Sequence, residues 1–519
     1  MEQDRFEITR VFSRPVPKSA YAAFLTSVLV GVLTHLYMLT NKFPNWDDLA
    51  NIDRYGAWDI LGRWLLPETH RLFGRYSTPA LNGTAAILLY ALTASLIVIS
   101  LRIRSITCAA LTGALLVTFP SLTSNMTFMF TVGDYALAVV IACLGVYLTH
   151  RFRFGFVAGI VLLFLSMGIY QAYLPLSAAL FLLILVADIL DGERAARIVK
   201  RGFIFLFTLG ASAVWHALYI RTMDLSEYRG MDQVGGATLA RLPVTVLRAY
   251  HRILQFFVTA PPSYVTREGR SLNLAVLAAA AAFLCVVLYQ RRAQISAGRL
   301  LMLAAFLLLL PLAASLVYVM APEVQKASTL MILSYVTVYI VPVLLLSRVR
   351  ISGGAGAGSK SRGSLMLSLL MFSLLCSVCY GNFKLANEAY FRTGIAFERI
   401  ENYYSRILVR LEDTEGYRYG DPVEIIGDSW PDPHVLSADM MSGTRFADLE
   451  GLAIENGIFT SGSRRFFLRT YFGMETGLNT GEDPYTRLHE TQEFRDMPVF
   501  PAAGCVKKID GIWVVKVED

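Results

Sequence analysis

Two adjacent carboxylates, Asp47 and Asp48, follow the first long apolar segment of the chain. A carboxylate at a membrane surface can act as a general base toward a sugar hydroxyl or a bound water. A structural role competes with this one, because the helix dipole favours Asp in the first turn of a helix. The residue types leave the catalytic and structural roles equally open, and they do not separate Asp47 from Asp48.

Cationic side chains follow the acidic pair in the same segment and recur in a later loop. Arg63 and Arg75 could bind a phosphate through the bidentate geometry of the guanidinium group. Lys326 could neutralise a phosphate, although a lysine that only reaches from an apolar segment to the membrane surface explains it as well. His70, between the two arginines, is a candidate contact for a sugar.

Three further polar residues stand beside apolar segments. Asp134 lies at the start of one, where an ionisable residue indicates function by default and a capping carboxylate is the alternative. Tyr170 and Gln171 occupy a tight turn between two others. Both can hydrogen-bond a sugar, although tyrosines at membrane boundaries are also common anchors. We therefore predict Asp134, Tyr170 and Gln171 as sugar or acceptor contacts.

The elements that must position these residues are membrane helices. Of the 519 residues, 55% are apolar and 17% are charged, and the mean hydropathy is +0.49. Soluble globular proteins carry about 25% charged residues. This composition excludes an ordinary soluble protein or a nucleic-acid-coating one, and predicts membrane lipid as the surroundings with no nucleic-acid partner.

About eleven segments reach or approach the roughly 20 apolar residues that cross a bilayer. They are residues 20–40, 82–101, 105–120, 129–149, 154–170, 172–190, 202–220, 272–290, 299–320, 328–347 and 364–383. We predict a transmembrane domain over residues 1–383. The first segment is interpreted as a retained helix, because it is too long for a signal peptide and has no cleavage pattern.

Basic residues fix the predicted orientation, because cytoplasmic loops are enriched in Lys and Arg. With the N-terminus inside, every inner segment is basic: Arg5, Arg10, Arg14 and Lys18; Arg102 and Arg104; Arg151 and Arg153; Arg194, Arg197, Lys200 and Arg201; Arg291, Arg292 and Arg299; Arg348, Arg350, Lys360 and Arg362. The net charge of +7 is thus largely an orientation signal. An odd number of spans places the C-terminus, and all the candidate residues, on the outer face.

The tail, residues 384–519, is predicted to be a small α+β domain on the outer face. Residues 384–411 have helical spacing of apolar residues, and Val423–Ile426 is a short strand pattern. Asp510-Gly511 between two apolar runs predicts a hairpin. Four aromatic residues of the tail could stack on sugars or belong to its core: Tyr403, Tyr404, Trp430 and Trp513.

Recognised nucleotide motifs are missing from the sequence in the contexts they require. Cys376 and Cys379 lie one helical turn apart without His or Asp partners, so no metal site is predicted there. A divalent metal is possible but not required. A glycosyltransferase facing outward has no nucleotide sugar available, so its donor would have to arrive attached to a lipid.

The motifs, in their order along the chain, resemble the GtrII-type bacterial glucosyltransferases, O-antigen-modifying proteins of the GT-C class. The resemblance rests on the basic N-terminus and on these motifs: Asn45-Trp46-Asp47-Asp48, Gly62-Arg63-Trp64, Phe119-Pro120, Tyr170-Gln171-Ala172-Tyr173, Met497-Pro498-Val499-Phe500-Pro501 and Gly504-Cys505-Val506. It implies a GT-C-like fold in the bacterial inner membrane, with the active site facing the periplasm. It also implies an essential acidic residue in the first outer loop, which corresponds to Asp47 or Asp48 here.

The resemblance further implies transfer of glucose from undecaprenyl-phosphate glucose to a polysaccharide, O-antigen or lipid-linked oligosaccharide acceptor. A carboxylate base and direct displacement of the polyprenyl phosphate would invert the anomeric centre, and no cofactor is needed. Two alternatives remain: a lipid-linked sugar flippase, which predicts internal repeats and broken helices, and an O-antigen polymerase or ligase.

Overall fold

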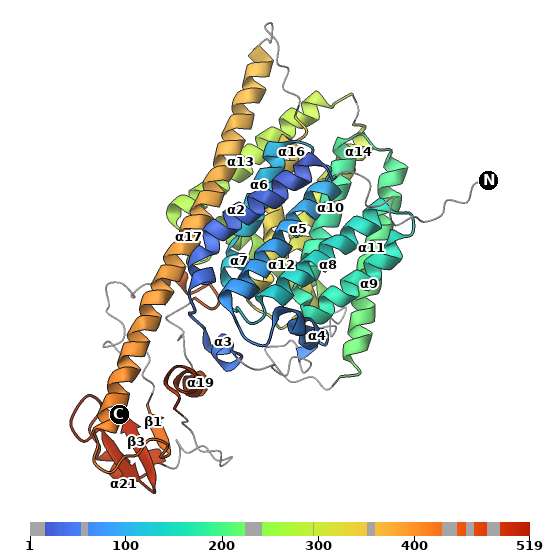
Figure 1. Ribbon diagram of the computed structural model, residues 1–519. Helices are drawn as coiled ribbons and strands as arrows, with labels where there is room; N and C mark the ends of the chain where they lie inside the picture. Colours follow the sequence, from blue (N-terminus) through green and yellow to red (C-terminus); the bar gives the residue numbers. More distant parts are fainter. Residues whose placement is uncertain are drawn as a thin grey trace.

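The computed structural model describes residues 16–52, 61–223, 241–293, 295–349, 359–427, 444–452, 461–474 and 488–518. The predictions made for Arg5, Arg10, Arg14, Arg350 and Trp430 fall outside these ranges. The described part of the chain is mostly helical, with a three-stranded sheet near the C-terminus (Figure 1). The prediction of a helical membrane protein with a small C-terminal strand region is therefore confirmed.

Apolar helices form one bundle, and each predicted span overlaps one of them. They are α2 (Lys18–Thr40), α5 (Thr84–Ser100), α6 (Ile106–Thr118), α8 (Val132–Arg151), α9 (Gly155–Ile169), α10 (Leu174–Leu190), α11 (Ala195–Ile220), α13 (Arg267–Gln290), α14 (Ala297–Ala314), α16 (Val336–Leu346) and α17 (Ser359–Glu412). In the described ranges, eight helices are long and apolar enough to cross a membrane, and three apolar ones are shorter. The count of eleven spans stays a prediction.

Short elements fill the ends of the bundle. The α-helical ones are α3 (Trp46–Ala50), α4 (Leu66–His70), α7 (Pro120–Asn125), α12 (Leu242–Leu254), α15 (Val317–Met320), α19 (Ser461–Phe472) and α21 (Gln492–Arg495). Single turns of other helix types are η2 (Arg71–Phe73), η3 (Pro79–Gly83), η4 (Gln171–Tyr173), η6 (Gln255–Thr259), η7 (Thr329–Met331), η8 (Leu333–Tyr335) and η9 (Thr444–Phe446). Several of them carry the candidate site residues.

Small residues let the helices approach closely, as is usual in membrane bundles. Helix α2 packs against α5 and α6, and α8 packs against α5 and α9. A Cβ added at Gly113 in α6 would lie 2.6 Å from the carbonyl oxygen of Ala23 in α2. Only glycine fits there without moving a backbone, so this contact fixes the distance between the first helix and the core.

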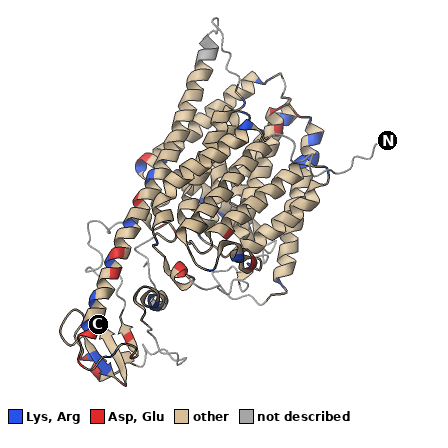
Figure 2. Cartoon of the chain, viewed as in Figure 1, with Lys and Arg blue, Asp and Glu red and all other residues tan. Residues whose placement is uncertain are grey.

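A network of charges closes one end of the bundle. The buried carboxylate of Asp188, at the end of α10, accepts hydrogen bonds from Arg102 and Arg201, each at 2.6 Å. Asp191 pairs with Arg348 at 3.1 Å. Loops that the charge pattern predicts to be cytoplasmic therefore meet at this end. Figure 2 shows charged residues at the ends of the bundle and along the tail, with few between them.

The tail begins inside a helix, because α17 runs without a break across residues 383 and 384, where the predicted domain boundary lies (Figure 1). Beyond it, the sheet has the order β1-β3-β2, formed by Val423–Ile426, Ile512–Lys516 and Val506–Ile509. Strand β1 is parallel to β3, whereas β2 and β3 form the predicted antiparallel hairpin. Asp510 and Gly511 have φ of 49° and 82°, as a tight hairpin turn requires.

The C-terminal half of α17 and the sheet share a hydrophobic core, which also contains Leu49 of α3. Tyr403, Tyr404 and Trp513 are buried in the tail, so the structure decides between the two roles left open for them in favour of the core. Helix α3 therefore lies between the bundle and the tail, and it carries the adjacent acidic pair.

Candidate functional site

A cavity of about 820 Å³ opens at the end of the bundle away from the Asp188 network. Its volume lies within the roughly 300–1,000 Å³ of small-molecule sites. Tyr170, just before α10, lines it, whereas Asp188 lies at the opposite end of the same helix. The residues around this pocket are Trp46, Asp47, Asn51, Leu61, Arg63, Phe128, Phe130, Tyr135, Tyr170, residues 323–331, Ala447, Asp448 and Glu450. Segments far apart in the sequence therefore converge on one pocket.

The side chain of Asp48 is buried and held by several contacts. Its carboxylate pairs with Lys42 and accepts a hydrogen bond from the Ser77 hydroxyl. It also accepts one from the backbone N–H of Phe130, at 3.1 Å. These contacts join the start of α3 to two other loops.

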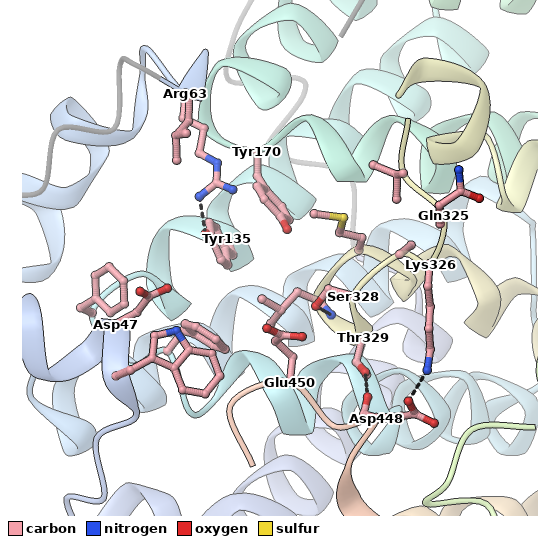
Figure 3. Close-up of a pocket in the computed structure, with 18 of the residues that line it drawn as sticks. Asp47, Arg63, Tyr135, Tyr170, Gln325, Lys326, Ser328, Thr329, Asp448 and Glu450 are labelled. Atoms are coloured by element: carbon pink, nitrogen blue, oxygen red, sulfur yellow. Dashed lines mark hydrogen bonds and ion pairs between the residues drawn. The ribbon is translucent and has the colours of Figure 1, made fainter. Parts of the chain in front are cut away.

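Asp47 lines the pocket and is labelled there in Figure 3. Helix α3 presents it: Asn45 caps the helix by accepting a hydrogen bond from the backbone N–H of Asp48, at 2.9 Å. The Asn51 side chain donates to the Asp47 carbonyl at 2.7 Å. The one-residue offset between Asp47 and Asp48 thus separates a pocket carboxylate from a buried one, a distinction that the sequence left open.

Arg63 reaches the pocket from a loop that other segments hold in place. Gly62 has a φ of 72°, the left-handed region that glycine enters without strain. The Gln171 side chain donates to the Gly62 carbonyl at 3.1 Å, and the Leu65 N–H donates to Gly168 at 2.8 Å. Gln171 is absent from the pocket lining. It contributes to the site by fixing the backbone beside Arg63.

Two stacked tyrosines form the wall that Arg63 contacts. The rings of Tyr135 and Tyr170 lie 4.4 Å apart at 20°. Arg63 donates a hydrogen bond to the Tyr135 hydroxyl at 3.1 Å, and its guanidinium carbon lies 4.8 Å from the centre of the Tyr170 ring. An arginine packed on aromatic rings keeps its charge and loses freedom. It suits recognition of an anionic group.

Lys326 lines the pocket on the side of the loop before η7, together with Asp448 of the tail (Figure 3). The lysine pairs with the Asp448 carboxylate. The Ser263 N–H also donates to that carboxylate, at 2.8 Å. Burial would raise the pKa of Asp448, but the hydrogen bonds from Lys326 and Ser263 outweigh it and lower the pKa below its ordinary value. Asp448 is therefore an anion at neutral pH.

Two of the predicted site residues meet outside the pocket. His70 Nδ1 lies 3.1 Å from the carboxylate of Asp134, and both side chains are buried. Neither lines the pocket. Arg75 is exposed beside the ring of Tyr76 and does not line it either. Of the nine predicted site residues, the structure brings four to the pocket lining: Asp47, Arg63, Tyr170 and Lys326.

The contributions of Tyr135, Asp448 and Glu450 to the lining were not predicted from the sequence. Tyr135 follows Asp134 at the start of an apolar segment, and that position could have drawn attention to it. Asp448 and Glu450 alternate with apolar residues in the tail, which is an ordinary pattern for a globular domain. No local signal connects them with loops more than a hundred residues away.

The described residues contain no group of three or more His, Cys, Asp or Glu side chains placed to hold a metal ion. The pocket combines one wall with Asp47 and Arg63 and another with Lys326, Asp448 and Glu450. Groups of these types can support two kinds of chemistry: proton transfer by a carboxylate and binding of an anion by cations.

The fold and the pocket define a helical membrane protein whose loops form a polar, ligand-sized site at one end of the bundle. Within that class, the chain belongs to the glucosyl transferase GtrII family, whose model matches residues 36–346, more than half of the chain. The family resemblance is confirmed, and the family indicates glucosyltransferase activity. No curated protein and no solved structure matches the chain.

Proposed function

We propose that the pocket is the active site for transfer of a glucosyl group from a polyprenyl-phosphate donor to a hydroxyl of a polysaccharide or lipid-linked oligosaccharide. The observation that supports this most directly is the joint presence of Asp47, Arg63 and Lys326 in one pocket. A transferase for a phosphate-linked sugar needs a base for the acceptor and cations for the leaving group. These three residues are of the required types.

In the proposed reaction, Asp47 removes the proton from the acceptor hydroxyl as its oxygen attacks the anomeric carbon. The bond between that carbon and the phosphate oxygen breaks, and the polyprenyl phosphate leaves with the bonding electrons. Attack from the side opposite the leaving group inverts the anomeric centre. Asp48 is not the base in this mechanism, because Lys42, Ser77 and Phe130 already occupy its carboxylate.

Arg63 and Lys326 are proposed to bind the donor phosphate and to stabilise the negative charge that grows on it. A polyprenyl phosphate is already a reasonable leaving group, so the proposal requires no metal or cofactor. Tyr170 is proposed to contact a sugar, since its ring lines the same pocket. Arg75, His70, Asp134 and Gln171 do not line it, and they are not assigned direct contacts with the substrates.

We further propose that the protein lies in the bacterial inner membrane with the pocket on the periplasmic side. The basic loops that meet around Asp188 and Asp191 support this orientation, because they would then be cytoplasmic. The pocket lies at the other end of the bundle, next to the tail. A reporter fused after Asp519 should give a periplasmic signal, and a cytoplasmic signal would contradict the orientation.

The activity is tested with purified protein in lipid nanodiscs, synthetic polyprenyl-phosphate glucose and an oligosaccharide acceptor. We expect transfer by the wild type, an inverted anomeric configuration in the product, and loss of transfer in Asp47→Asn. Asp421→Asn, in the tail and outside the pocket lining, is the matched control and should keep its activity. Translocation of the lipid without any sugar transfer would favour the flippase instead.

A further inference from the structure

A short segment of the tail, Thr444–Leu452, is built into the helical bundle. Three of its side chains, Phe446, Leu449 and Leu452, are buried in the main core of the bundle. Between these anchors, Asp448 and Glu450 line the pocket. The alternation of core and pocket residues means that this segment forms part of the pocket wall. This segment lies outside the residues matched by the family model.

Asp448 is held through both its side chain and its backbone. Its carboxylate accepts from the Ser263 N–H at 2.8 Å, and its own N–H donates to the Ser263 hydroxyl at 3.1 Å. The Thr329 hydroxyl donates to its backbone carbonyl. Asp448 therefore joins the tail to two loops of the bundle, and its carboxylate has a fixed place.

Lys326, in contrast to Asp448, is largely exposed. Its side chain is 62% exposed, whereas that of Asp448 is 23% exposed. A lysine side chain is flexible, and its ammonium group has three hydrogens to donate. One hydrogen can stay on the Asp448 carboxylate while the other two remain for a second anion. The Asp448 carboxylate thus restrains the flexible Lys326 side chain without using all the donors of the ammonium group.

We propose that Asp448 is a positioning residue that holds Lys326 at the pocket wall, so that the ammonium group is placed to bind the phosphate of the lipid-linked donor. This inference rests on the proposed function, and it makes the tail a necessary part of the donor site. Asp448 acts through Lys326 and does not touch the reacting atoms. The competing possibility is that Asp448 occupies the place of the phosphate and must be displaced.

The test compares Asp448→Asn, Asp448→Glu and Lys326→Gln with the wild type in nanodiscs. If Asp448 positions Lys326, Asp448→Asn should raise KM for the donor about tenfold with a much smaller change in kcat. Asp448→Glu should restore part of the loss, because it keeps the negative charge. In the Lys326→Gln background, Asp448→Asn should add little, since the residue through which it acts is gone. Asp421→Asn is the control for a carboxylate of the tail away from the pocket.

Three outcomes would overturn the inference. Additive losses in the double variant would mean that Asp448 does not act through Lys326. Tighter donor binding in Asp448→Asn would identify the carboxylate as a competitor of the phosphate. A lower melting temperature with equal losses in kcat at saturating donor would indicate a merely structural role.

A binding measurement distinguishes failure of the proposed function from failure of the positioning inference. Polyprenyl phosphate without a sugar is titrated against the tryptophan fluorescence of the protein, to which Trp46 in the pocket lining contributes. If this lipid binds the wild type and binds about tenfold more weakly to Asp448→Asn, the positioning inference holds even where no sugar is transferred. If the lipid binds both equally, the positioning inference is wrong whatever the activity.

Discussion

Asp47 and Asp48 are neighbours in the chain, but their carboxylates enter different surroundings. Asp48 is buried against Lys42 and the Phe130 N–H, while Asp47 lines a pocket of about 820 Å³. A five-residue helix produces this division, because consecutive side chains on a helix point in directions about 100° apart. Asp47 is thereby placed at the pocket lining, and Asp48 joins three segments together.

Asparagine at the two positions should therefore have different effects. We expect Asp47→Asn to reduce kcat by about 10²–10⁴-fold, the usual contribution of a general base, without a change in melting temperature. Asp48→Asn should destabilise the protein by roughly 1.5–3 kcal/mol, the range for hydrogen bonds to charged groups. Transfer assays and thermal unfolding of both variants measure these effects. Full activity of Asp47→Asn would exclude it as the base.

Arg63 should affect donor binding. Replacing it with alanine removes a charge-assisted contact of about 1.5–3 kcal/mol, so we expect donor KM to rise roughly 10- to 100-fold. Arg63→Lys should recover only part of this, because lysine lacks the planar guanidinium that packs on Tyr170. Initial rates over a range of donor concentrations measure both. An unchanged donor KM in Arg63→Ala would remove Arg63 from the phosphate site.

Gln171 should act through the loop that carries Arg63. Gln171→Ala removes the hydrogen bonds to the Leu61 and Gly62 carbonyls, so we expect a several-fold higher donor KM. The double variant Arg63→Ala, Gln171→Ala should resemble Arg63→Ala alone, because coupled residues are not additive. A specific loss of acceptor affinity in Gln171→Ala would instead support its sequence-based assignment as a direct sugar contact.

The His70–Asp134 pair should contribute to stability. Asp134→Ala removes a buried hydrogen bond to His70, and we expect a loss of about 1–3 kcal/mol. Activity per folded molecule should change less than it does in Asp47→Asn. A double-mutant cycle with His70→Ala, followed by thermal unfolding, gives the coupling between the two. An unaltered melting temperature together with a raised acceptor KM would contradict this assignment.

Acid should weaken the attachment of the tail at Asp448. Its pKa is lowered in the folded protein, so its stabilising contribution is complete above the unfolded value of about 3.9. That contribution is lost as the pH falls through the lower folded value. The difference in melting temperature between wild type and Asp448→Asn should be constant from about pH 5 to 8 and shrink below about pH 4. If the difference in melting temperature instead grew on acidification, the pKa of Asp448 would be raised, not lowered, in the folded protein.

Much of the fold could be predicted from the sequence because its physical causes are local. Each predicted span overlaps a helix, since a continuous apolar segment in lipid must satisfy its own backbone hydrogen bonds. The hairpin around Asp510-Gly511 also follows from local turn chemistry. The unbroken course of α17 from the bundle into the tail was not predicted, because the change from apolar to polar composition suggested a boundary at residue 384.

The sequence by itself determined the residue types of the site: an acidic pair, arginines and a lysine in loops that follow apolar helices. Tertiary structure decided which of them face one cavity. Asp47 and Arg63 are at the pocket while Asp134 and His70 pair elsewhere, and Asp448 reaches Lys326 across 122 residues. The reason is physical: helix propensity and hydropathy are local properties, whereas the direction of a side chain depends on partners that only the packed bundle brings together.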